Sequence, residues 1–365
     1  MKTGKLKILI SGGGTGGHIY PAIAVAQALE LALDGQVEFQ FVGASNRMEM
    51  EKVPKAGYPI EGLWISGIQR SLSTSNLLFP VKVLHSVWKS IGIIKRFKPD
   101  LAIGFGGYAS GASMYAAGLM GVPVLIHEQN SFAGITNKIL KDKAQKICVA
   151  YQGMEKFFPA NKLILTGNPV RKDILNLSGL RDEAMRFFSI RSDRKTILVI
   201  GGSLGARTIN QAMHAGYQQL LDAGYNLIWQ KGNNFSVADG LNQEGLFCDN
   251  FIYRMDLAYA AADLVVSRAG ALSVAEIAIA GKPVILVPSP NVAEDHQTMN
   301  AMALVNNQAA ILVKDKDAAK DLVPAVLELA GNESQCKQLS TAIQKMAMPN
   351  AASHIAEIAL SLIKK

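Results

Sequence analysis

The sequence predicts an α/β protein built from two Rossmann-like domains, each a doubly wound parallel sheet. Its 365 residues exceed the size of one typical domain. Short apolar runs alternate with longer helical patterns along the whole chain, which is typical of βαβ units. Both halves also open with an apolar strand that runs into glycines and then a helix, at residues 7–18 and again at 196–207. With 49% hydrophobic and 18% charged residues, intrinsic disorder is excluded.

Strands are expected wherever a short apolar run is bounded by glycine or polar residues. In the first half these runs are 7–11, 37–42, 101–104, 122–127 and 146–150. In the second half they are 196–200, 227–230, 250–252, 263–267, 284–288 and 310–313. We place the linker near 165–169, which predicts domains at 1–165 and 166–340. Residues 341–365 are predicted to form a terminal helix that packs back toward the N-terminal domain.

One uncharged stretch, residues 101–126, is long enough to span a bilayer. It contains six glycines and a proline, so we interpret it as strand, glycine loop, buried helix and strand. The basic start of the chain leads directly into glycines and lacks the apolar core of a signal peptide, so the protein is expected to stay inside the cell. The three widely spaced cysteines are interpreted as core thiols.

The positive charge is confined to the first half. Residues 1–165 hold 18 Lys and Arg against 10 Asp and Glu, whereas the remainder holds 19 of each. This asymmetry suggests an anionic partner, either lipid headgroups or nucleic acid. Residues 77–98 favour lipid, because they mix large apolar groups with cations as an interfacial helix does; the alternative is that the apolar face packs on the sheet. The expected membrane residues are Leu77, Leu78, Phe79, Lys82, Trp88 and Lys89.

Glycines at 12, 14 and 17 follow the first strand and match the fingerprint of dinucleotide-binding loops. A nicotinamide site would need an acidic residue at the end of the second strand. Here that strand ends Phe41-Val42-Gly43, without such a residue, which argues against a nicotinamide cofactor. His18 stands at a helix start, where a cation is disfavoured, so it is either a neutral base or a cap for the loop. A second glycine-rich loop, residues 104–111, suggests that the two loops form a diphosphate cradle.

Three further polar motifs follow strands or begin helices. Residues 127–130 (His-Glu-Gln-Asn) end a buried strand, where polar groups need either a ligand or an internal network. Ser273 and Glu276 have the spacing of a capping box, although the Glu276 carboxylate could instead accept the hydroxyls of a ribose. Asp315-Lys316-Asp317 has the letters of a metal-binding Asp-x-Asp, but the flanking lysines argue against a divalent cation.

Taken together, these segments resemble the MurG family of glycosyltransferases, which add N-acetylglucosamine to the undecaprenyl-diphosphate-linked muramoyl-pentapeptide of bacterial cell-wall synthesis. The resemblance spans nearly the whole chain and rests on seven motifs in the family's order: 13–18, 106–111, 127–130, 167–171, 201–203, 270–276 and 295–297. Ser273 stands where some members have Thr, and Ala112 where Pro often occurs. The resemblance implies a GT-B fold, in which two Rossmann-like domains face a central cleft.

The resemblance also implies partners and site residues. The lipid-linked acceptor is expected on the N-terminal domain and UDP-N-acetylglucosamine mostly on the C-terminal domain, with no cofactor, no metal and no nucleic acid. Substrate-binding residues would be Thr15, Gly16, Gly17, Tyr108, Asn130, Asn137, Arg171, Ser203, Ile252, Ala271, Leu272, Ser273, Val274, Ala275, Glu276 and Gln297. Within this set, Glu276 would hold the ribose and the Ile252 main chain would read uracil. The enzyme would lie peripherally on the cytoplasmic face of the inner membrane.

The expected reaction is inverting transfer, in which the acceptor 4-hydroxyl displaces UDP directly. A base must take the hydroxyl proton, and His18 is the leading candidate with Glu128 second. Arg171, the Ser203 loop and the helix starting near Ser273 would stabilise the leaving diphosphate without a metal. Two other functions remain open at this point: a nicotinamide-dependent dehydrogenase and a non-catalytic membrane scaffold that binds a nucleotide.

Overall fold

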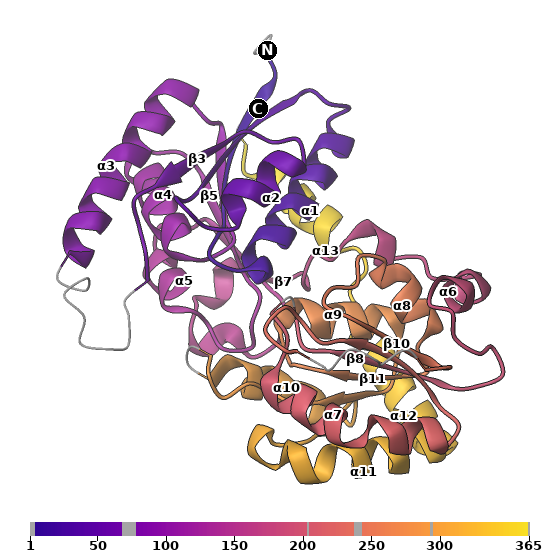
Figure 1. Ribbon diagram of the computed structural model, residues 1–365. Coiled ribbons are helices and arrows are strands. Elements are labelled where there is room, and N and C mark those ends of the chain that lie inside the picture. Colours follow the sequence, from indigo (N-terminus) through magenta and orange to yellow (C-terminus); the bar gives the residue numbers. More distant parts are fainter. Residues whose placement is uncertain (1–3, 68–77, 203, 237–242, 293–294, 364–365) are drawn as a thin grey trace. The chain divides into compact units, whose positions relative to one another are not determined.

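The computed structural model describes residues 4–67, 78–202, 204–236, 243–292 and 295–363. The chain divides into two compact units (Figure 1). The first comprises Met1–Arg171 together with Pro349–Lys365, and the second comprises Lys172–Met348. Each unit is an α/β structure around its own parallel sheet, as the sequence predicts.

The first unit contains a seven-stranded parallel sheet with the strand order β3-β2-β1-β4-β5-β6-β7. Its elements are, in chain order, β1 (Leu6–Ser11), α1 (Gly16–Ala32), β2 (Val37–Ala44), α2 (Glu49–Lys55), β3 (Ile60–Leu63), α3 (Phe79–Phe97), β4 (Leu101–Gly104), α4 (Tyr108–Leu119), β5 (Val124–Glu128), α5 (Ile135–Leu140), β6 (Lys146–Val149), β7 (Leu163–Leu165) and α13 (Ala351–Ser361).

Side chains of this sheet alternate between two cores, as the two-residue period of a strand requires. Ile8 and Ile10 join the core formed with α1, α2 and α13, whereas Leu9 joins the core formed with α3, α4 and α5. Figure 1 shows these two groups of helices on opposite faces of the sheet. Burial on both faces explains why the central strand β4 has no polar side chain.

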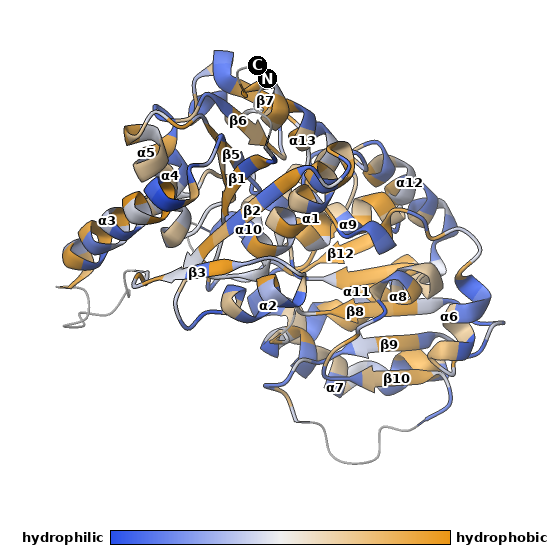
Figure 2. Cartoon of the chain, turned by 90° about the horizontal axis from the view of Figure 1, so that it is seen from above, coloured by the Kyte–Doolittle hydropathy of each residue, from blue (hydrophilic) through white to orange (hydrophobic). Residues whose placement is uncertain are grey.

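The second unit contains a six-stranded parallel sheet with the strand order β10-β9-β8-β11-β12-β13. Its elements are, in chain order, α6 (Arg181–Phe187), β8 (Thr196–Ile200), α7 (Arg207–Asp222), β9 (Asn226–Gln230), β10 (Leu246–Asp249), α8 (Met255–Ala261), β11 (Leu264–Ser267), α9 (Ala271–Ala280), β12 (Val284–Leu286), α10 (His296–Val305), β13 (Ile311–Leu312), α11 (Ala318–Gly331) and α12 (Glu333–Gln344). Figure 2 shows the hydrophobic character of its central strands.

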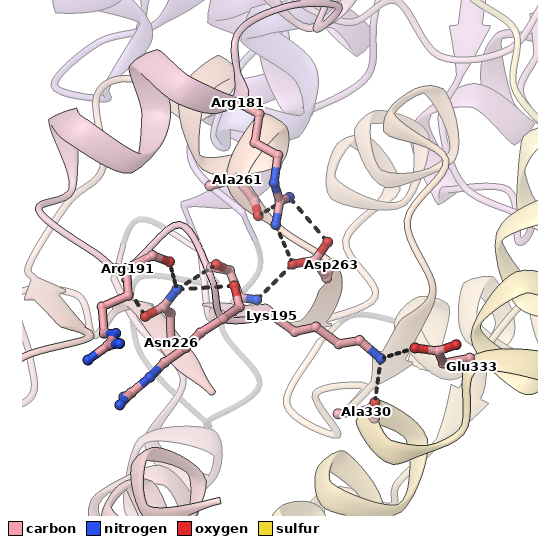
Figure 3. A network of polar contacts seen from close by, with 10 residues as sticks. Arg181, Arg191, Lys195, Asn226, Ala261, Asp263, Ala330 and Glu333 are labelled. Carbon is pink, nitrogen blue, oxygen red and sulfur yellow. Dashed lines mark hydrogen bonds and ion pairs between the residues drawn. The ribbon is translucent and has the colours of Figure 1, made fainter. Parts of the chain in front are cut away.

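A polar network closes the amino-terminal edge of this second sheet (Figure 3). The Asp263 carboxylate accepts two hydrogen bonds from the Arg181 guanidinium, at 3.1 and 2.9 Å, and one from the Thr196 amide at 2.8 Å. Nearby, Lys195 pairs with Glu333 at 3.0 Å. These charged groups therefore link α6, β8, β11 and α12 through hydrogen bonds and an ion pair.

The strand orders define where each sheet is built to bind a ligand. In both sheets the chain reverses its direction of winding beside the first strand, between β1 and β4 in one unit and between β8 and β11 in the other. In open parallel sheets, ligands bind at the carboxyl ends of the strands at this switch point. The loops after these four strands, together with the starts of the helices that follow them, hold most of the predicted substrate-binding residues.

Some element boundaries differ from those predicted. The strand expected at 250–252 is wrong: β10 is Leu246–Asp249, because the Ile252 amide bonds to the Gln230 side chain rather than to a neighbouring strand. Strands β3 and β7 were not predicted. β3 contains Glu and Gly, and β7 has three residues and lies where the first domain was expected to end.

The single helix predicted over 341–365 is also wrong. The chain forms α12 up to Gln344 and then α13 from Ala351, with Pro349 in the connection. A proline cannot donate the amide that a continuous helix needs there. Ile355 of α13 lies in the core of the first unit, whereas Ile343 of α12 belongs to the second unit.

The uncharged stretch 101–126 folds as β4, α4 and the start of β5, which confirms its interpretation as strand, glycine loop, buried helix and strand. Within the described ranges, no helix has the combined length and apolarity needed to cross a bilayer.

Candidate functional site

The loops after β1 and β4 meet at the switch point of the first sheet. The Gly13 amide donates to the Gly106 carbonyl at 3.4 Å. Gly107 has a φ of 87°, and a Cβ there would lie 2.5 Å from the Gly13 carbonyl oxygen, so no other residue fits. The two glycine-rich loops identified in the sequence are therefore packed against each other within this unit.

His18 lies in the first turn of α1, against this junction. Its Nδ1 is 2.8 Å from the Gly13 carbonyl oxygen and 3.4 Å from the Thr15 hydroxyl. Because a carbonyl oxygen only accepts, Nδ1 carries the proton in the neutral ring and the lone pair is on Nε2. A Cβ at Gly106 would lie 3.1 Å from Nε2, so the ring edge with the basic nitrogen faces the second glycine loop. The side chain is half-buried.

Glu49, the first residue of α2, is a site residue that the sequence analysis missed. Its side chain is completely buried. One oxygen, Oε1, accepts from the Ala44 amide at 2.9 Å, and both oxygens lie within 3.2 Å of the Gly14 amide. A carboxylate thus fixes the glycine loop to the end of β2. No local sequence signal points to this role, since Glu49 comes five residues after β2 ends at Ala44 and begins a short helix.

Glu128 ends β5 and is buried within the loop that follows it. Its Oε1 accepts from the Asn130 amide at 3.1 Å, and its Oε2 accepts from the Gly134 amide at 3.0 Å and the Asn137 side chain at 2.8 Å. Both carboxylate oxygens therefore hold the loop 130–137. Of the predicted substrate residues, Asn130 and Asn137 are brought together here.

His127, next to Glu128, is buried and neutral. Its Nε2 donates to the Gly167 carbonyl at 2.9 Å, and its Nδ1 accepts from the Gln129 amide at 3.0 Å. Burial is the largest cause that lowers the pKa of His127 from 6.5 to about 4. Gln129 also donates to the Phe105 carbonyl, so this polar motif forms an internal network that joins the ends of β4 and β5.

The remaining predicted residues of the first unit lie at its surface or its end. Thr15 is exposed, and Gly16 and Gly17 begin α1. Tyr108 begins α4, is exposed and packs edge-on against Phe79 of α3. Arg171 is half-buried at the boundary of the unit.

In the second unit, the end of β9 links two predicted donor-binding segments. The Gln230 side chain donates to the Gly202 carbonyl at 3.0 Å and accepts from the Ile252 amide at 2.9 Å. The main chain of Ile252 was expected to read uracil, and its amide is bonded to a side chain here. Ser203 lies outside the described residues, as does Leu77 of the expected membrane segment.

Helix α9 begins at the carboxyl end of β11. Its N-cap is Gly270, so Ser273 is the third helical residue and the capping box considered from the sequence does not form. The first turn consists of Ala271, Leu272 and Ser273, whose amides point out of the helix N-terminus. One turn on, the Glu276 carboxylate accepts from the Tyr259 hydroxyl at 3.2 Å.

The rest of the predicted donor-binding residues lie on α9 and α10. Val274 is buried, Ala275 is half-buried, and Gln297 near the start of α10 accepts from the Ser289 amide at 2.9 Å. Like the loops of the first unit, these residues gather at the carboxyl edge of their own sheet.

Asp315, the first residue of the Asp-x-Asp motif, takes part in an ion pair. Arg268, which follows β11, bonds to its carboxylate and to the Val287 carbonyl and the Thr208 hydroxyl. Asp315 therefore fixes Arg268 and is not arranged as a metal ligand. Among the residues that the structure describes, no cluster of three or more His, Cys, Asp or Glu side chains is placed to hold a metal ion.

Known proteins resemble this chain over its full length. Residues 8–149 match the glycosyltransferase family 28 N-terminal domain, and residues 196–355 match the C-terminal domain of the same family. A relative from Bacteroides fragilis is 51% identical over 99% of this chain and 96% of its own length. A relative from Cytophaga hutchinsonii is 52% identical over 98% and 97%. Both are named UDP-N-acetylglucosamine--N-acetylmuramyl-(pentapeptide) pyrophosphoryl-undecaprenol N-acetylglucosamine transferase.

Solved structures agree with the fold. The crystal structure of Acinetobacter baumannii MurG matches 98% of this chain and 99% of its own with a TM-score of 0.78 and 29% identity. A UDP-GlcNAc 2-epimerase from Neisseria meningitidis, 15% identical with a TM-score of 0.68, shares the fold alone. The predicted GT-B fold is thereby confirmed. With full-length relatives near 50% identity and both of its domains matched, the chain belongs to glycosyltransferase family 28.

Proposed function

We propose that this enzyme transfers N-acetylglucosamine from UDP-N-acetylglucosamine to the 4-hydroxyl of the muramoyl residue in undecaprenyl-diphospho-muramoyl-pentapeptide. The observation that carries this proposal is the identity of about half of all residues with relatives that bear the name of this reaction. The second unit would bind the UDP-sugar and the first unit the lipid-linked acceptor. No step requires a cofactor.

His18 is the proposed base. It takes the proton of the acceptor hydroxyl on Nε2 while that oxygen bonds to the anomeric carbon, and UDP leaves from the opposite face with the electron pair of the broken bond. The hydrogen bond from Nδ1 to the Gly13 carbonyl supports this role, because it leaves the lone pair on Nε2. Glu128 is less suited, since both of its oxygens are already used in holding the loop 130–137.

Donor binding is assigned to the carboxyl edge of the second sheet. The N-terminus of α9 would face the diphosphate, where the helix dipole and the first-turn amides favour negative charge. Arg171, Ser203 and Gln297 would complete the contacts to diphosphate and sugar. Glu276, held by Tyr259, would accept the ribose hydroxyls, and the Ile252 main chain would bind the uracil.

The direct test is transfer of radiolabelled N-acetylglucosamine. Purified protein is incubated with labelled UDP-N-acetylglucosamine and the lipid-linked muramoyl acceptor, and the lipid phase is extracted and counted. The proposal predicts acceptor-dependent label in the lipid phase. Binding of UDP without such label would instead support the nucleotide-binding scaffold, and reduction of a nicotinamide cofactor would support a dehydrogenase.

Peripheral membrane binding at the cytoplasmic face of the inner membrane is part of the same proposal. Helix α3 mixes hydrophobic and hydrophilic residues along its length (Figure 2). The exposed apolar residues on this helix and at its N-cap are Leu78, Val81, Leu84 and Trp88. Lys95 is exposed on the same helix. Such a surface suits anionic lipid. Lys82 and Lys89 contribute less directly, because they bond to Ser66 and to the Gly62 carbonyl.

Vesicle sedimentation tests this surface. Leu84 and Trp88 are 72% and 74% exposed, so a Leu84→Ser, Trp88→Ser variant should stay folded and bind anionic vesicles several-fold more weakly. Leu31→Ser on α1 is the matched control, because Leu31 is 73% exposed and lies on another helix. Equal sedimentation of the double variant and the control would remove α3 from the membrane-binding surface.

A further inference from the structure

We propose that Glu49 positions and polarises His18 through the single peptide group that joins Gly13 to Gly14. This inference deepens the proposed function and rests on the role of His18 as the base. Glu49 does not touch the reacting atoms, so it is a positioning residue.

The two ends of that peptide group make the connection. Its N–H, on Gly14, donates to the Glu49 carboxylate at 3.1 Å to Oε2 and 3.2 Å to Oε1. Its C=O, on Gly13, accepts from His18 Nδ1 at 2.8 Å. In a trans peptide these two groups point in opposite directions. One rigid, planar unit therefore lies between the carboxylate and the imidazole.

The surroundings of Glu49 are built to hold a carboxylate. Its side chain is completely buried, and the Ala44 amide supplies a further hydrogen bond at 2.9 Å. Space for it depends on two glycines: a Cβ at Gly13 would lie 2.2 Å from Oε1, and a Cβ at Gly43 would lie 2.5 Å from Cγ. Burying an ionised group is costly, and main-chain amides are the partners that offset the cost here.

The charge has a chemical consequence at His18. A carboxylate that accepts from the N–H of a peptide group polarises that group, so that electron density shifts toward its carbonyl oxygen. Hydrogen bonds linked in this way strengthen one another. The Gly13 oxygen thus becomes a better acceptor for Nδ1–H. This favours the Nδ1–H tautomer and stabilises the imidazolium that forms when Nε2 takes the hydroxyl proton. The carboxylate of a Ser-His-Asp triad acts similarly by direct contact.

During the step, one proton moves from the acceptor hydroxyl to Nε2. The Nδ1 proton stays on the ring, and Glu49 stays ionised. His127 of β5 is a titratable group whose charge interacts with that of His18, and a positive charge on both rings is unfavourable. Burial keeps His127 neutral near pH 7, so Glu49 provides the favourable charge and His127 does not add an unfavourable one.

The test compares Glu49→Gln with Glu51→Gln in the full-length enzyme labelled with 15N-histidine. Glu51 is the matched control: it lies on the same helix, is exposed, and pairs with Lys52 and Lys55 at the surface. We expect Glu49→Gln to lower the pKa of His18 by about half a unit or more and kcat by about tenfold, with donor KM within about twofold. Glu51→Gln should change none of these. A His18 titration unaltered by Glu49→Gln would overturn the inference.

Two further measurements separate this inference from the proposed function. In the double variant with His18→Ala, Glu49→Gln should slow turnover no further; an additional tenfold loss would mean that Glu49 acts on another group. If His18→Ala alone keeps normal turnover, the role of His18 as base is lost, while the 15N titration still decides whether Glu49 acts on the ring. Should Glu49→Gln fail to fold, the wild-type spectrum decides: a neutral His18 protonated mainly on Nε2 would contradict the inference, and one protonated mainly on Nδ1 would support it.

Discussion

The two units share a strand, a glycine loop and a helix, but they hold the loop in different ways. After β1, the loop is fixed by the buried carboxylate of Glu49. After β8, the Gly202 carbonyl is held by the neutral amide of Gln230. Gly205 of the same loop packs on the main chain, where a Cβ would lie 2.1 Å from the Lys231 carbonyl oxygen. That carbonyl is in turn held by the Asn210 amide.

The difference corresponds to the chemistry that we assign to each loop. A buried anion behind an imidazole stabilises the imidazolium, so it suits the loop that lies against the proposed proton acceptor. The same anion beside a diphosphate would repel it, with little solvent to screen the repulsion. Neutral amides fix the second loop without this penalty. Similar sequence motifs have therefore acquired different supports for different charges.

The largest expected effect is on the first loop. His18→Ala should lower kcat by about 100-fold or more, because the proposed mechanism then lacks the group that takes the hydroxyl proton. Donor KM should change much less. Transfer of radiolabel to the acceptor measures both constants. Near-normal turnover would show that His18 only caps the loop.

The second prediction concerns His127, the buried neighbour of the first loop. Its pKa is lowered to about 4 in the folded protein, whereas an unfolded histidine titrates near 6.5. Between these values the unfolded chain binds a proton that the folded chain does not. The free energy of unfolding should therefore fall as pH drops from about 6.5 toward about 4, by roughly 3 kcal/mol.

Denaturant unfolding at a series of pH values checks this contribution of His127. His127→Asn should be less stable at pH 7, because the hydrogen bond to Gly167 is lost. Its unfolding free energy should also depend less on pH within the same window. An equal pH dependence in variant and wild type would assign the acid sensitivity to other groups.

The third prediction concerns the second unit. Glu276→Ala should raise the donor KM by roughly tenfold, because the ribose hydroxyls lose a charged acceptor, with a smaller change in kcat. Glu328→Ala, at an exposed position of α11, serves as the control. Unchanged kinetics in Glu276→Ala would mean that its contact with Tyr259 is purely structural.

The smallest expected effect comes from placing a charge at Gln230, whose neutral side-chain amide holds the second glycine loop. Gln230→Glu replaces the donor to the Gly202 carbonyl by a carboxylate, so UDP should bind about fivefold more weakly. Gln219→Glu adds the same charge at an exposed position of α7. Calorimetric titration with UDP compares them. Equal affinities in the two variants would show that UDP binding does not depend on an uncharged side chain at position 230.

The sequence predicted the sheets well because their signal is local. Strands such as β4 and β8 are buried on both faces, and their apolar runs predict both ends of each strand correctly. Edge strands carry less of this signal: β3 is Ile-Glu-Gly-Leu, and β10 was placed several residues too late. The break before α13 was missed because apolar residues recur on both sides of Pro349.

The glycine loops and His18 could be predicted from the sequence, but the side chains that hold these loops, such as Glu49, could not. Glu49 lies 35 residues from Gly14, the amide it binds, and 31 residues from His18. Contacts at such separations depend on the strand order β2-β1-β4, which a single sequence does not encode locally. The capping box failed for the opposite reason: Ser273 and Glu276 have the right spacing, but the helix begins two residues before Ser273, at Ala271.

The central claim is that proton transfer and diphosphate binding belong to different glycine loops. The most direct test is the dissociation constant of UDP for His18→Ala, measured by calorimetry on the preparation used for kinetics. The account predicts an affinity within about twofold of wild type, although turnover falls about 100-fold. A tenfold loss of UDP affinity would contradict it, because the first loop would then be part of the diphosphate site.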